Sequence, residues 1–316
     1  MKHALSGALI AIVAVAAALS PSGPSVEAVA AATDTQCGSK YGQAPPAWEH
    51  VTIIVFENKK FSQIIGKTAD APYLNSLAVA CSYATNMNHM TPTSLTNYIA
   101  MTSGYTGHMN GQEVLITGTK NPPIWPQDSV SIFEAMGSDA REWAESMPSN
   151  CSMKSVGDFH VGHTPYQYYT RTQKTLCPQY AVPLGSSTAM SARYNLLIPN
   201  KANDMHGTAT LTTSTARIRA GDAWASRFIP TMLASPEYQA GRSAIIISWD
   251  EASAKTTKMP YIVISPYTKA GGTTDIRYDH YSTLKGVQQM LGVTPLLGHA
   301  ADGNVNSIAD DPIFSL

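Results

Sequence analysis

The fold of this chain is decided by residues 243–251, which read SAIIISWDE. The apolar and largely β-branched part of this segment is typical of a strand buried on both faces. Asp250 and Glu251 follow at the point where the strand must end. Two adjacent carboxylates repel each other unless a cation or a proton lies between them. The segment therefore predicts a buried strand with a functional site at its tip.

The same pattern occurs earlier, at residues 51–58, which read VTIIVFEN. Here another apolar strand is followed directly by Glu57 and Asn58. If the two strands are parallel neighbours, both polar pairs lie at the carboxyl edge of one sheet, where open α/β sheets bind their ligands. We therefore expect these four polar side chains to lie together.

The rest of the chain alternates between predicted strands and helices. Short strands are expected at residues 196–200 and 259–265, and a strand or turn at 142–147. Helices are expected at residues 72–81, 94–104, 129–136, 215–234 and 278–291. Residues 105–127 and 148–188 are expected to be irregular loops over the site, the second as an insertion. This order predicts an α/β fold with a mostly parallel central sheet and helices on both faces.

Composition and the N-terminus indicate an exported protein. The chain has 316 residues and a net charge of −1, so neither a nucleic-acid-binding face nor a disordered acidic tail is expected. Lys2 and His3 precede an apolar run at residues 4–19 and small residues up to 32, the layout of a secretory signal peptide. The alternative is an uncleaved anchor, for which the run is short. We expect residues 1–32 to be removed and residues 33–316 to form a single secreted, soluble and monomeric domain.

The chain has four cysteines, Cys37, Cys81, Cys151 and Cys177. None forms a C-x-x-C pair, so a zinc ribbon is not expected. In an exported protein, an even and well-spaced set favours disulfides. Of the three possible connectivities, we prefer the nearest-neighbour pairing, Cys37 with Cys81 and Cys151 with Cys177.

Several familiar catalytic motifs are missing from the sequence. It contains no G-x-S-x-G, no H-E-x-x-H and no G-x-G-x-x-G, and the GKT at residues 66–68 lacks the first glycine of a P-loop. The remaining candidates are polar side chains that follow strands or begin helices, with three histidines: Glu57, Asn58, Thr93 or Ser94, Asp250, Glu251, His163, His206 and His280.

These residue types point to metal-assisted chemistry. Carboxylate and amide oxygens suit a divalent cation, with calcium, magnesium or manganese favoured and zinc or iron still open. A hydroxyl at the start of a helix can cap the helix or act as a nucleophile toward phosphorus. The polar segment 201–207 is either part of a site or an Asx-rich turn. A lone histidine, such as His160 or His163, is more often structural. Together they predict attack on a phosphate ester, or on a sulfate ester.

The order and spacing of seven short segments resemble a known family. They are residues 55–58, 91–98, 144–148, 163–165, 199–206, 248–251 and 279–282. They resemble the bacterial secreted phosphoesterases that include acid phosphatases and non-zinc phospholipases C, relatives of the alkaline phosphatase superfamily. The resemblance runs from about residue 50 to about residue 292 and implies an alkaline-phosphatase-like fold.

The resemblance implies a role for each candidate residue. Ser94 would be the nucleophile, with Thr93 as the alternative, and would form a phosphoserine intermediate. The histidines would act in catalysis, and the segments around them would contact the substrate. The implied metal ligands are Glu57, Asn58, Ser94, Asp250 and Glu251; the implied catalytic histidines are His163, His206 and His280; and the implied substrate contacts are Asn97, His163, Asp204 and His206.

Two positions depart from the family pattern. Family members commonly have a histidine and a proline just before the serine, where this chain has Pro92-Thr93. They also commonly have a cysteine near the position of Ala202. The first change concerns the shape of the phosphate pocket, and the second removes one potential disulfide partner.

The expected function is that of a secreted, metal-dependent phosphoesterase that hydrolyses phosphomonoesters. One divalent cation is expected as cofactor, and a small phosphate ester or a phospholipid head group as substrate. The alternative is a phospholipase C that acts on a phosphocholine or phosphoinositol lipid. A sulfatase would need an arginine in a C/S-x-P-x-R motif, which residues 94–98 do not provide. A binding protein that has lost activity would be expected to lack one of the ligands, and all of them are present.

Overall fold

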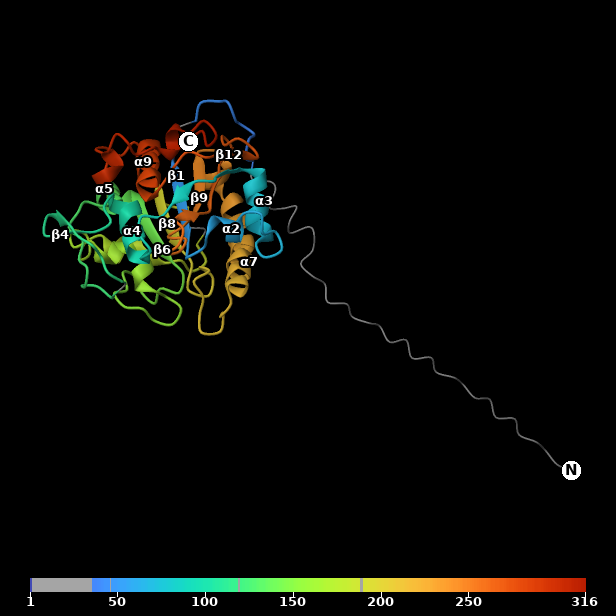
Figure 1. The fold of residues 1–316 in the computed structure, drawn as a ribbon, viewed down its shortest axis with the longest axis horizontal. Helices are drawn as coiled ribbons and strands as arrows, with labels where there is room; N and C mark the ends of the chain where they lie inside the picture. Colours follow the sequence, from blue (N-terminus) through green and yellow to red (C-terminus); the bar gives the residue numbers. More distant parts are fainter. Residues whose placement is uncertain (2–35, 46, 119, 188–189) are drawn as a thin grey trace.

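The computed structural model describes Met1 and residues 36–45, 47–118, 120–187 and 190–316. The expected signal peptide lies outside the described residues. Within the described part, an eight-stranded sheet crosses the molecule in the order β12-β2-β11-β9-β1-β8-β6-β7 (Figure 1). Its strands are β1 (His50–Phe56), β2 (Ser82–Ala84), β6 (Ala140–Ala144), β7 (Ala181–Pro183), β8 (Tyr194–Ile198), β9 (Ser243–Trp249), β11 (Tyr261–Ile264) and β12 (Gly272–Thr274).

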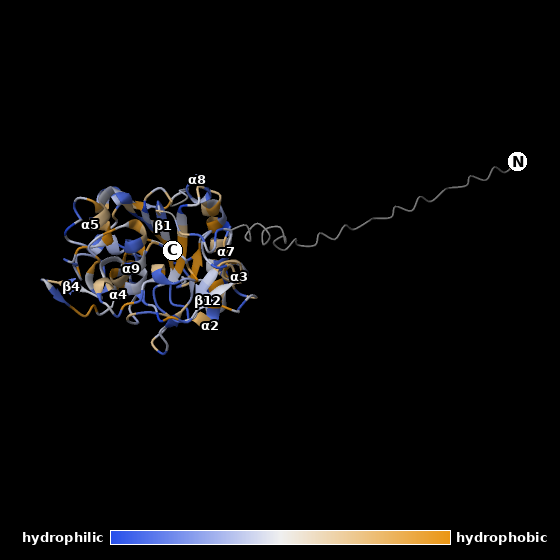
Figure 2. Ribbon diagram, turned by 90° about the horizontal axis from the view of Figure 1, so that it is seen from above, coloured by the Kyte–Doolittle hydropathy of each residue, from blue (hydrophilic) through white to orange (hydrophobic). Residues whose placement is uncertain are grey.

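The sheet is mostly parallel, as predicted. Strands β9, β1, β8, β6 and β7 run parallel to one another, and β11 alone runs antiparallel, between β9 and β2. β12 pairs parallel with β2. Every residue of β9 is buried, and so is every residue of β1 after His50. Figure 2 shows the hydrophobic colour of the central strands. Their burial on both faces explains these continuous apolar sequences.

Helices cover both faces of the sheet. α3 (Pro72–Ala80) packs against α7 (Ser214–Leu233) on one side, and α4 (Ser94–Ser103) packs against α9 (His280–Leu291) on the other (Figure 1). The predicted helices are thus confirmed, with α5 (Ile132–Met136) shorter than expected. The other short helices are α2 (Phe61–Ile64), α6 (Cys177–Tyr180), α8 (Pro236–Gln239), η1 (Gly137–Asp139), η2 (Val161–His163), η3 (Pro165–Tyr168), η4 (Gly298–Ala301) and η5 (Ile308–Asp310).

The two predicted loops contain more structure than expected. Residues 105–127 include the small hairpin of β4 (His108–Met109) and β5 (Gln112–Glu113). Residues 148–188 were predicted to be an insertion, but they supply β7, the edge strand of the sheet. The prediction was wrong there because β7 is short and only its first residue is fully buried, so it has no continuous apolar run. A last small ladder pairs β3 (Met87–Asn88) with β10 (Lys258–Met259).

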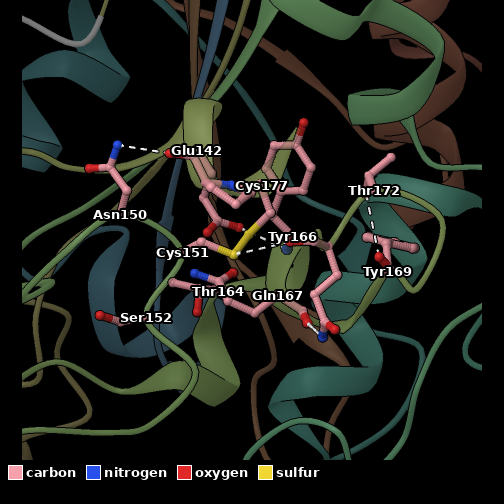
Figure 3. Close-up of a disulfide and its surroundings, with 12 residues drawn as sticks. Glu142, Asn150, Cys151, Ser152, Thr164, Tyr166, Gln167, Tyr169, Thr172 and Cys177 are labelled. Carbon is pink, nitrogen blue, oxygen red and sulfur yellow. Dashed lines mark hydrogen bonds between the residues drawn. A yellow bond between two sulfur atoms is a disulfide. The ribbon is translucent and has the colours of Figure 1, made fainter. Parts of the chain in front are cut away.

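The predicted disulfide pairing is confirmed. Cys37 is bonded to Cys81, at the end of α3, and Cys151 is bonded to Cys177, at the start of α6. Figure 3 shows the second bridge beside the carboxylate of Glu142 and the backbone of residues 164–167. None of the helices in the described part of the chain is both long and apolar enough to cross a bilayer.

Candidate active site

The carboxyl ends of β1 and β9 bring the two polar pairs together. The strands are parallel neighbours in a register that places Phe56 beside Trp249, so the residues after them emerge side by side. The Asn58 backbone N–H donates to Asp250 Oδ1 (3.0 Å), and the Asp250 backbone N–H donates to the Phe56 carbonyl (2.9 Å). The predicted convergence at the sheet edge is therefore present. Asn58 adopts a positive φ of 44°, an uncommon backbone conformation that turns the chain away from the strand.

Ser94 reaches this edge from the start of α4. Its hydroxyl donates to Glu57 Oε2 at 3.1 Å. Thr93 is the N-cap residue, in an extended conformation, and its side chain makes no capping hydrogen bond. The sequence left two roles open for a hydroxyl at this helix start, capping or catalysis. The Ser94 hydroxyl points across to the sheet edge, toward Glu57.

Asn97 supports the loop before Ser94 instead of facing a substrate. Its side-chain oxygen accepts the Met90 amide (2.9 Å), and its nitrogen donates to the carbonyls of Thr91 (2.7 Å) and Thr93 (3.1 Å). The side chain is fully buried. These contacts engage both polar atoms, so its expected contact with a substrate gives way to positioning of the loop.

Tyr98 is a site residue that the sequence analysis missed. Its hydroxyl donates to Glu57 Oε1 at 2.6 Å, while Ser94 holds the other oxygen of the same carboxylate. Tyr98 follows Ser94 by one helical turn, so both side chains lie on the same face of α4. That spacing, within a segment already singled out for the resemblance, is the signal that could have identified it.

The segment 200–207 lies against the same edge. The Glu57 amide donates to the Asp204 carbonyl (2.7 Å), and Asp204 Oδ1 accepts the His206 amide (2.7 Å), an Asx-type turn. The segment therefore contains the Asx-type turn, and this turn lies against the edge where the candidate residues gather. Lys59, also missed from sequence, is buried and donates from Nζ to the Met205 carbonyl at 2.8 Å. Met205 has a positive φ of 75°.

Glu145, which follows β6, fixes this segment from the other side. Its carboxylate accepts the Asn203 side-chain amide at 2.9 Å and the Asn200 backbone N–H at 3.0 Å. The segment thus has hydrogen bonds to the residues that directly follow β1 and β6.

The three predicted histidines differ in their placement. His163 Nδ1 lies 3.4 Å from Glu57 Oε1 and 3.5 Å from Asp204 Oδ2. The His206 ring is 6.0 Å from that of His163 and is exposed to solvent. His280, the first residue of α9, donates from Nε2 to the Asp250 carbonyl at 2.7 Å. Its contact is therefore with the backbone that carries the acid pair.

The sequence analysis treated His160 as a structural residue. Its ring lies 4.4 Å from that of His163, and its buried Nδ1 has no hydrogen-bond partner among the described residues. It is therefore a close neighbour of the site.

The carboxylates of the site have raised pKa values because they are buried together. Burial, followed by the charges of Asp250 and Asp204, holds the pKa of Glu57 well above its usual range. Burial likewise raises the pKa of Asp250. Burial and the neighbouring Asp250 raise the pKa of Glu251 to about 8, and burial raises that of Asp204 to about 7. Such a cluster favours either bound protons or a bound cation.

The basic groups of the site are shifted in the opposite direction. Burial lowers the pKa of His163 to about 3 and that of His280 to about 4. Burial, and then repulsion from Arg217, lowers the pKa of Lys59 to about 8. Neutral imidazoles of this kind can accept or donate hydrogen bonds without adding charge.

The oxygens of the site fit a hard divalent cation. Several are buried and have no hydrogen-bond partner within the described part of the chain, namely Asn58 Oδ1, Asp204 Oδ2, Asp250 Oδ2 and Glu251 Oε2. Oxygen donors of this kind suit calcium, magnesium or manganese. Among the described residues, no three His, Cys, Asp or Glu side chains are grouped to hold an ion by themselves. A cation here would therefore depend on the Asn58 amide and the Ser94 hydroxyl as well as on carboxylates.

Sequence comparison relates this chain to known proteins. A family model described as the Phosphoesterase family matches residues 70–294, which include Ser94 and the acid pair but begin after Glu57. The predicted start of the resemblance, near residue 50, lies outside this match. A phosphatidylinositol-3-phosphatase of Mycobacterium tuberculosis is 26% identical over 262 residues, which are 82% of this chain and 82% of the relative.

Solved structures show the same fold at low sequence identity. A Vibrio parahaemolyticus protein of the alkaline phosphatase superfamily has a TM-score of 0.52 at 10% identity, over 87% of this chain and 78% of that one. A phosphonate monoester hydrolase of Silicibacter pomeroyi has a TM-score of 0.53 at 11% identity, over 84% of this chain and 76% of that one. The predicted alkaline-phosphatase-like fold is confirmed by these likenesses.

Proposed function

Because this chain belongs to the Phosphoesterase family and hydrolyses phosphoric esters, we propose that it acts as a metal-dependent phosphomonoesterase with Ser94 as its nucleophile. One observation carries the proposal, the 3.1 Å hydrogen bond from the Ser94 hydroxyl to Glu57 at the edge where the buried acids converge. A hydroxyl that only capped α4 would accept a hydrogen bond from a backbone N–H of the helix.

In the proposed first step, Ser94 Oγ attacks phosphorus. The Oγ–P bond forms as the bond from phosphorus to the leaving alcohol breaks. The serine proton passes to Glu57 Oε2, which already accepts its hydrogen bond, while Tyr98 holds Oε1. His206, exposed at the mouth of the site, can give a proton to the departing alcohol.

In the second step, water attacks the phosphoserine. A bond forms from the water oxygen to phosphorus as the P–Oγ bond breaks, one water proton passes to His206, the proton on Glu57 returns to Ser94 Oγ, and inorganic phosphate leaves. The side chains proposed to hold a divalent cation are Glu57, Asn58, Ser94, Asp250 and Glu251. When bound, such a cation would neutralise charge on the phosphate and lower the pKa of the serine hydroxyl.

A phosphomonoester is favoured over the diester of a phospholipase C reaction. The Mycobacterium tuberculosis relative carries the name of a phosphatase acting on a phosphoinositide. We extend that chemistry to this chain, with a phosphoinositide or a smaller phosphate ester as substrate. Export with removal of residues 1–32 belongs to the same proposal and is supported by the two disulfides.

Substitution of the nucleophile tests the proposal. In an aryl phosphate assay, Ser94→Ala should lower kcat by a factor on the order of 10³ or more, as expected when a nucleophile is removed. Thr93→Ala is the matched control and should stay within about threefold of wild type, since the Thr93 side chain makes no capping bond. Mass spectrometry of quenched enzyme should find a phosphoryl group on Ser94. Full turnover by Ser94→Ala would end the proposal.

A further inference from the structure

A cavity of about 460 Å³ opens beside the acid pair. Its lining includes Asn58 and Glu251 together with Lys60, Ser214 and Arg217. Ser94 does not line it. A phosphate ester attacked by Ser94 would therefore extend its alcohol, and not its scissile phosphate, toward this space.

Arg217 is held in a fixed position at this cavity. Its Nε donates to the Leu211 carbonyl at 2.7 Å. Gly207 packs directly against the guanidinium, since a Cβ at that position would come within 2.4 Å of Arg217 Nε. Gly207 also has a φ of +97°, which favours glycine. The loop after His206 is thus shaped around the arginine.

The positive charges of Lys60 and Arg217, which line the cavity, have no carboxylate partners in the part of the chain that the structure describes. Within the described ranges, no ion pair joins Arg217 or Lys60 to an acid, whereas Arg219, on the same helix, pairs with Asp70 at 2.8 Å. The charge of Arg217 is also close enough to affect buried Lys59. Cationic side chains gathered in a cleft attract anions, and an arginine fork suits phosphate in particular.

We propose that Arg217 and Lys60 bind a second anionic group of the substrate, separate from the phosphate that Ser94 attacks. The inference rests on the proposed function, because it assumes that the scissile phosphate lies at Ser94. The substrate class is then a polyol phosphomonoester that carries another phosphate, either free in solution or as the diester of a lipid head group.

A matched pair of soluble substrates tests this subsite. Inositol 1,3-bisphosphate and inositol 3-phosphate differ only in the second phosphate. A charge-assisted contact should make kcat/KM for the bisphosphate at least about tenfold higher in the wild type. In Arg217→Gln, this preference should fall to about twofold or less, mainly through loss of the bisphosphate rate. Equal loss on both substrates, or no preference in the wild type, would overturn the inference.

Arg227→Gln is the control, because Arg227 is an exposed arginine farther along α7. It should keep the wild-type preference. Binding of inositol 1,3-bisphosphate to Ser94→Ala protein, measured by calorimetry, separates the subsite from the reaction. Suppose that neither the wild type nor any variant hydrolyses either ester, but that adding Arg217→Gln to the Ser94→Ala protein weakens this binding about tenfold. The proposed function then fails and the subsite stands.

Vesicles distinguish the two sources of the second anion. The rates of wild type and Arg217→Gln are compared on phosphatidylinositol 3-phosphate in neutral phosphatidylcholine vesicles and in vesicles with added phosphatidylserine. If Arg217→Gln lowers the rate in neutral vesicles by the same factor as its rate on the soluble bisphosphate, the subsite binds the head group. A defect that appears only with phosphatidylserine would assign Arg217 to the membrane surface and contradict the inference.

Discussion

Glu57 links the sheet edge to helix α4. One of its oxygens accepts the Ser94 hydroxyl and the other accepts the Tyr98 hydroxyl, and its backbone amide donates to Asp204. The side chain is fully buried, with His163 close by. A carboxylate in this position orients the serine only if both of its oxygens are held, which makes Tyr98 a positioning residue.

Tyr98→Phe should lower activity without disturbing the fold. The ring would still pack against His163, but Glu57 Oε1 would lose its 2.6 Å hydrogen bond. Hydrogen bonds to charged groups contribute about 1.5–3 kcal/mol, so kcat should fall by roughly 10- to 100-fold. Steady-state kinetics on an aryl phosphate measures this, and KM should change less than kcat.

Tyr169→Phe is the control for that substitution. Its hydroxyl is also buried and lies 2.7 Å from Thr102 at the far end of α4, away from Glu57. It should cost stability but leave kcat within about twofold. A Tyr98→Phe enzyme with wild-type kcat would show that Glu57 needs no second hydrogen bond.

The residues that sequence could identify are those at the ends of elements. Glu57 and Asp250 follow buried strands directly, and Ser94 begins a helix, so their types alone were informative. Tyr98 and Lys59 looked like ordinary interior residues of a helix and a loop. Their roles come from contacts to Glu57 and Met205 across the fold, which no local pattern specifies.

At the scale of elements, the site depends on the register of β1 and β9. Their unbroken apolar sequences predicted burial on both faces, and this burial predicted a parallel sheet with its polar residues at one edge. The short β7 and the antiparallel direction of β11 could not be predicted, because neither the presence of β7 nor the direction of β11 has a distinctive pattern of apolar and polar residues in the sequence. They are specified by the neighbouring strands with which they pair.

The Cys151–Cys177 bridge should matter for activity as well as stability. It joins two residues at a sequence separation of 26 and closes a segment that contains His160 and His163 but only short 3₁₀ helices and no strand of the central sheet. Loop-closure entropy predicts a loss of about 3–4 kcal/mol in Cys151→Ala/Cys177→Ala, visible as a lower urea midpoint. Because the closed segment carries His163 beside Glu57, loosening it should also lower kcat/KM at least about threefold.

The other bridge supplies the matched control. Cys37–Cys81 spans 44 residues, so its double alanine variant should lose a similar free energy of unfolding, about 4 kcal/mol. The segment it closes contains β1, which β8 and β9 hold on both sides. Activity of the folded variant should therefore stay near wild type. Equal activity losses in both variants would contradict this distinction.

Strand β6 contains a buried acid whose pKa predicts a pH effect. Burial raises the pKa of Glu142 from 4.5 to about 8, although Oε2 accepts the Tyr166 amide at 3.0 Å. Its Oε1 has no partner. The folded state therefore holds this proton more tightly than the unfolded state, so the free energy of unfolding falls as pH rises from about 4.5 to about 8.

Glu142→Gln should remove this part of the pH dependence. Each pKa unit corresponds to about 1.4 kcal/mol. Near pH 8 the free energy of unfolding of the variant should therefore be higher than that of the wild type by a few kcal/mol. Near pH 4.5 the two should have similar stability, since both side chains are then neutral. The measurement is the difference between their urea unfolding free energies at each pH, which cancels the effect of the other acids. A difference that does not change with pH would contradict the assignment.

At the scale of the whole molecule, the net charge of −1 conceals an uneven distribution. Acidic side chains are buried at the ends of β1 and β9, and Lys60 and Arg217 line the neighbouring cavity together with Glu251. Composition predicted that the chain has no nucleic-acid partner, but it could not locate this division. It arises because α7, distant in sequence from β1, is folded against the same edge.

A cluster of buried acids should make the stability of the whole protein depend on a cation. A cation that binds only the folded state at 100 times its Kd adds about 2.7 kcal/mol to the free energy of unfolding. We therefore expect calcium, magnesium or manganese, added singly to chelator-treated protein, to raise the urea midpoint in a saturable way for at least one ion. Asp250→Asn/Glu251→Gln should abolish the gain, while Asp275→Asn, at an exposed acid, should keep it. A midpoint that responds to none of the cations would mean that protons alone stabilise the acid cluster, because bound metal and folding free energy are linked.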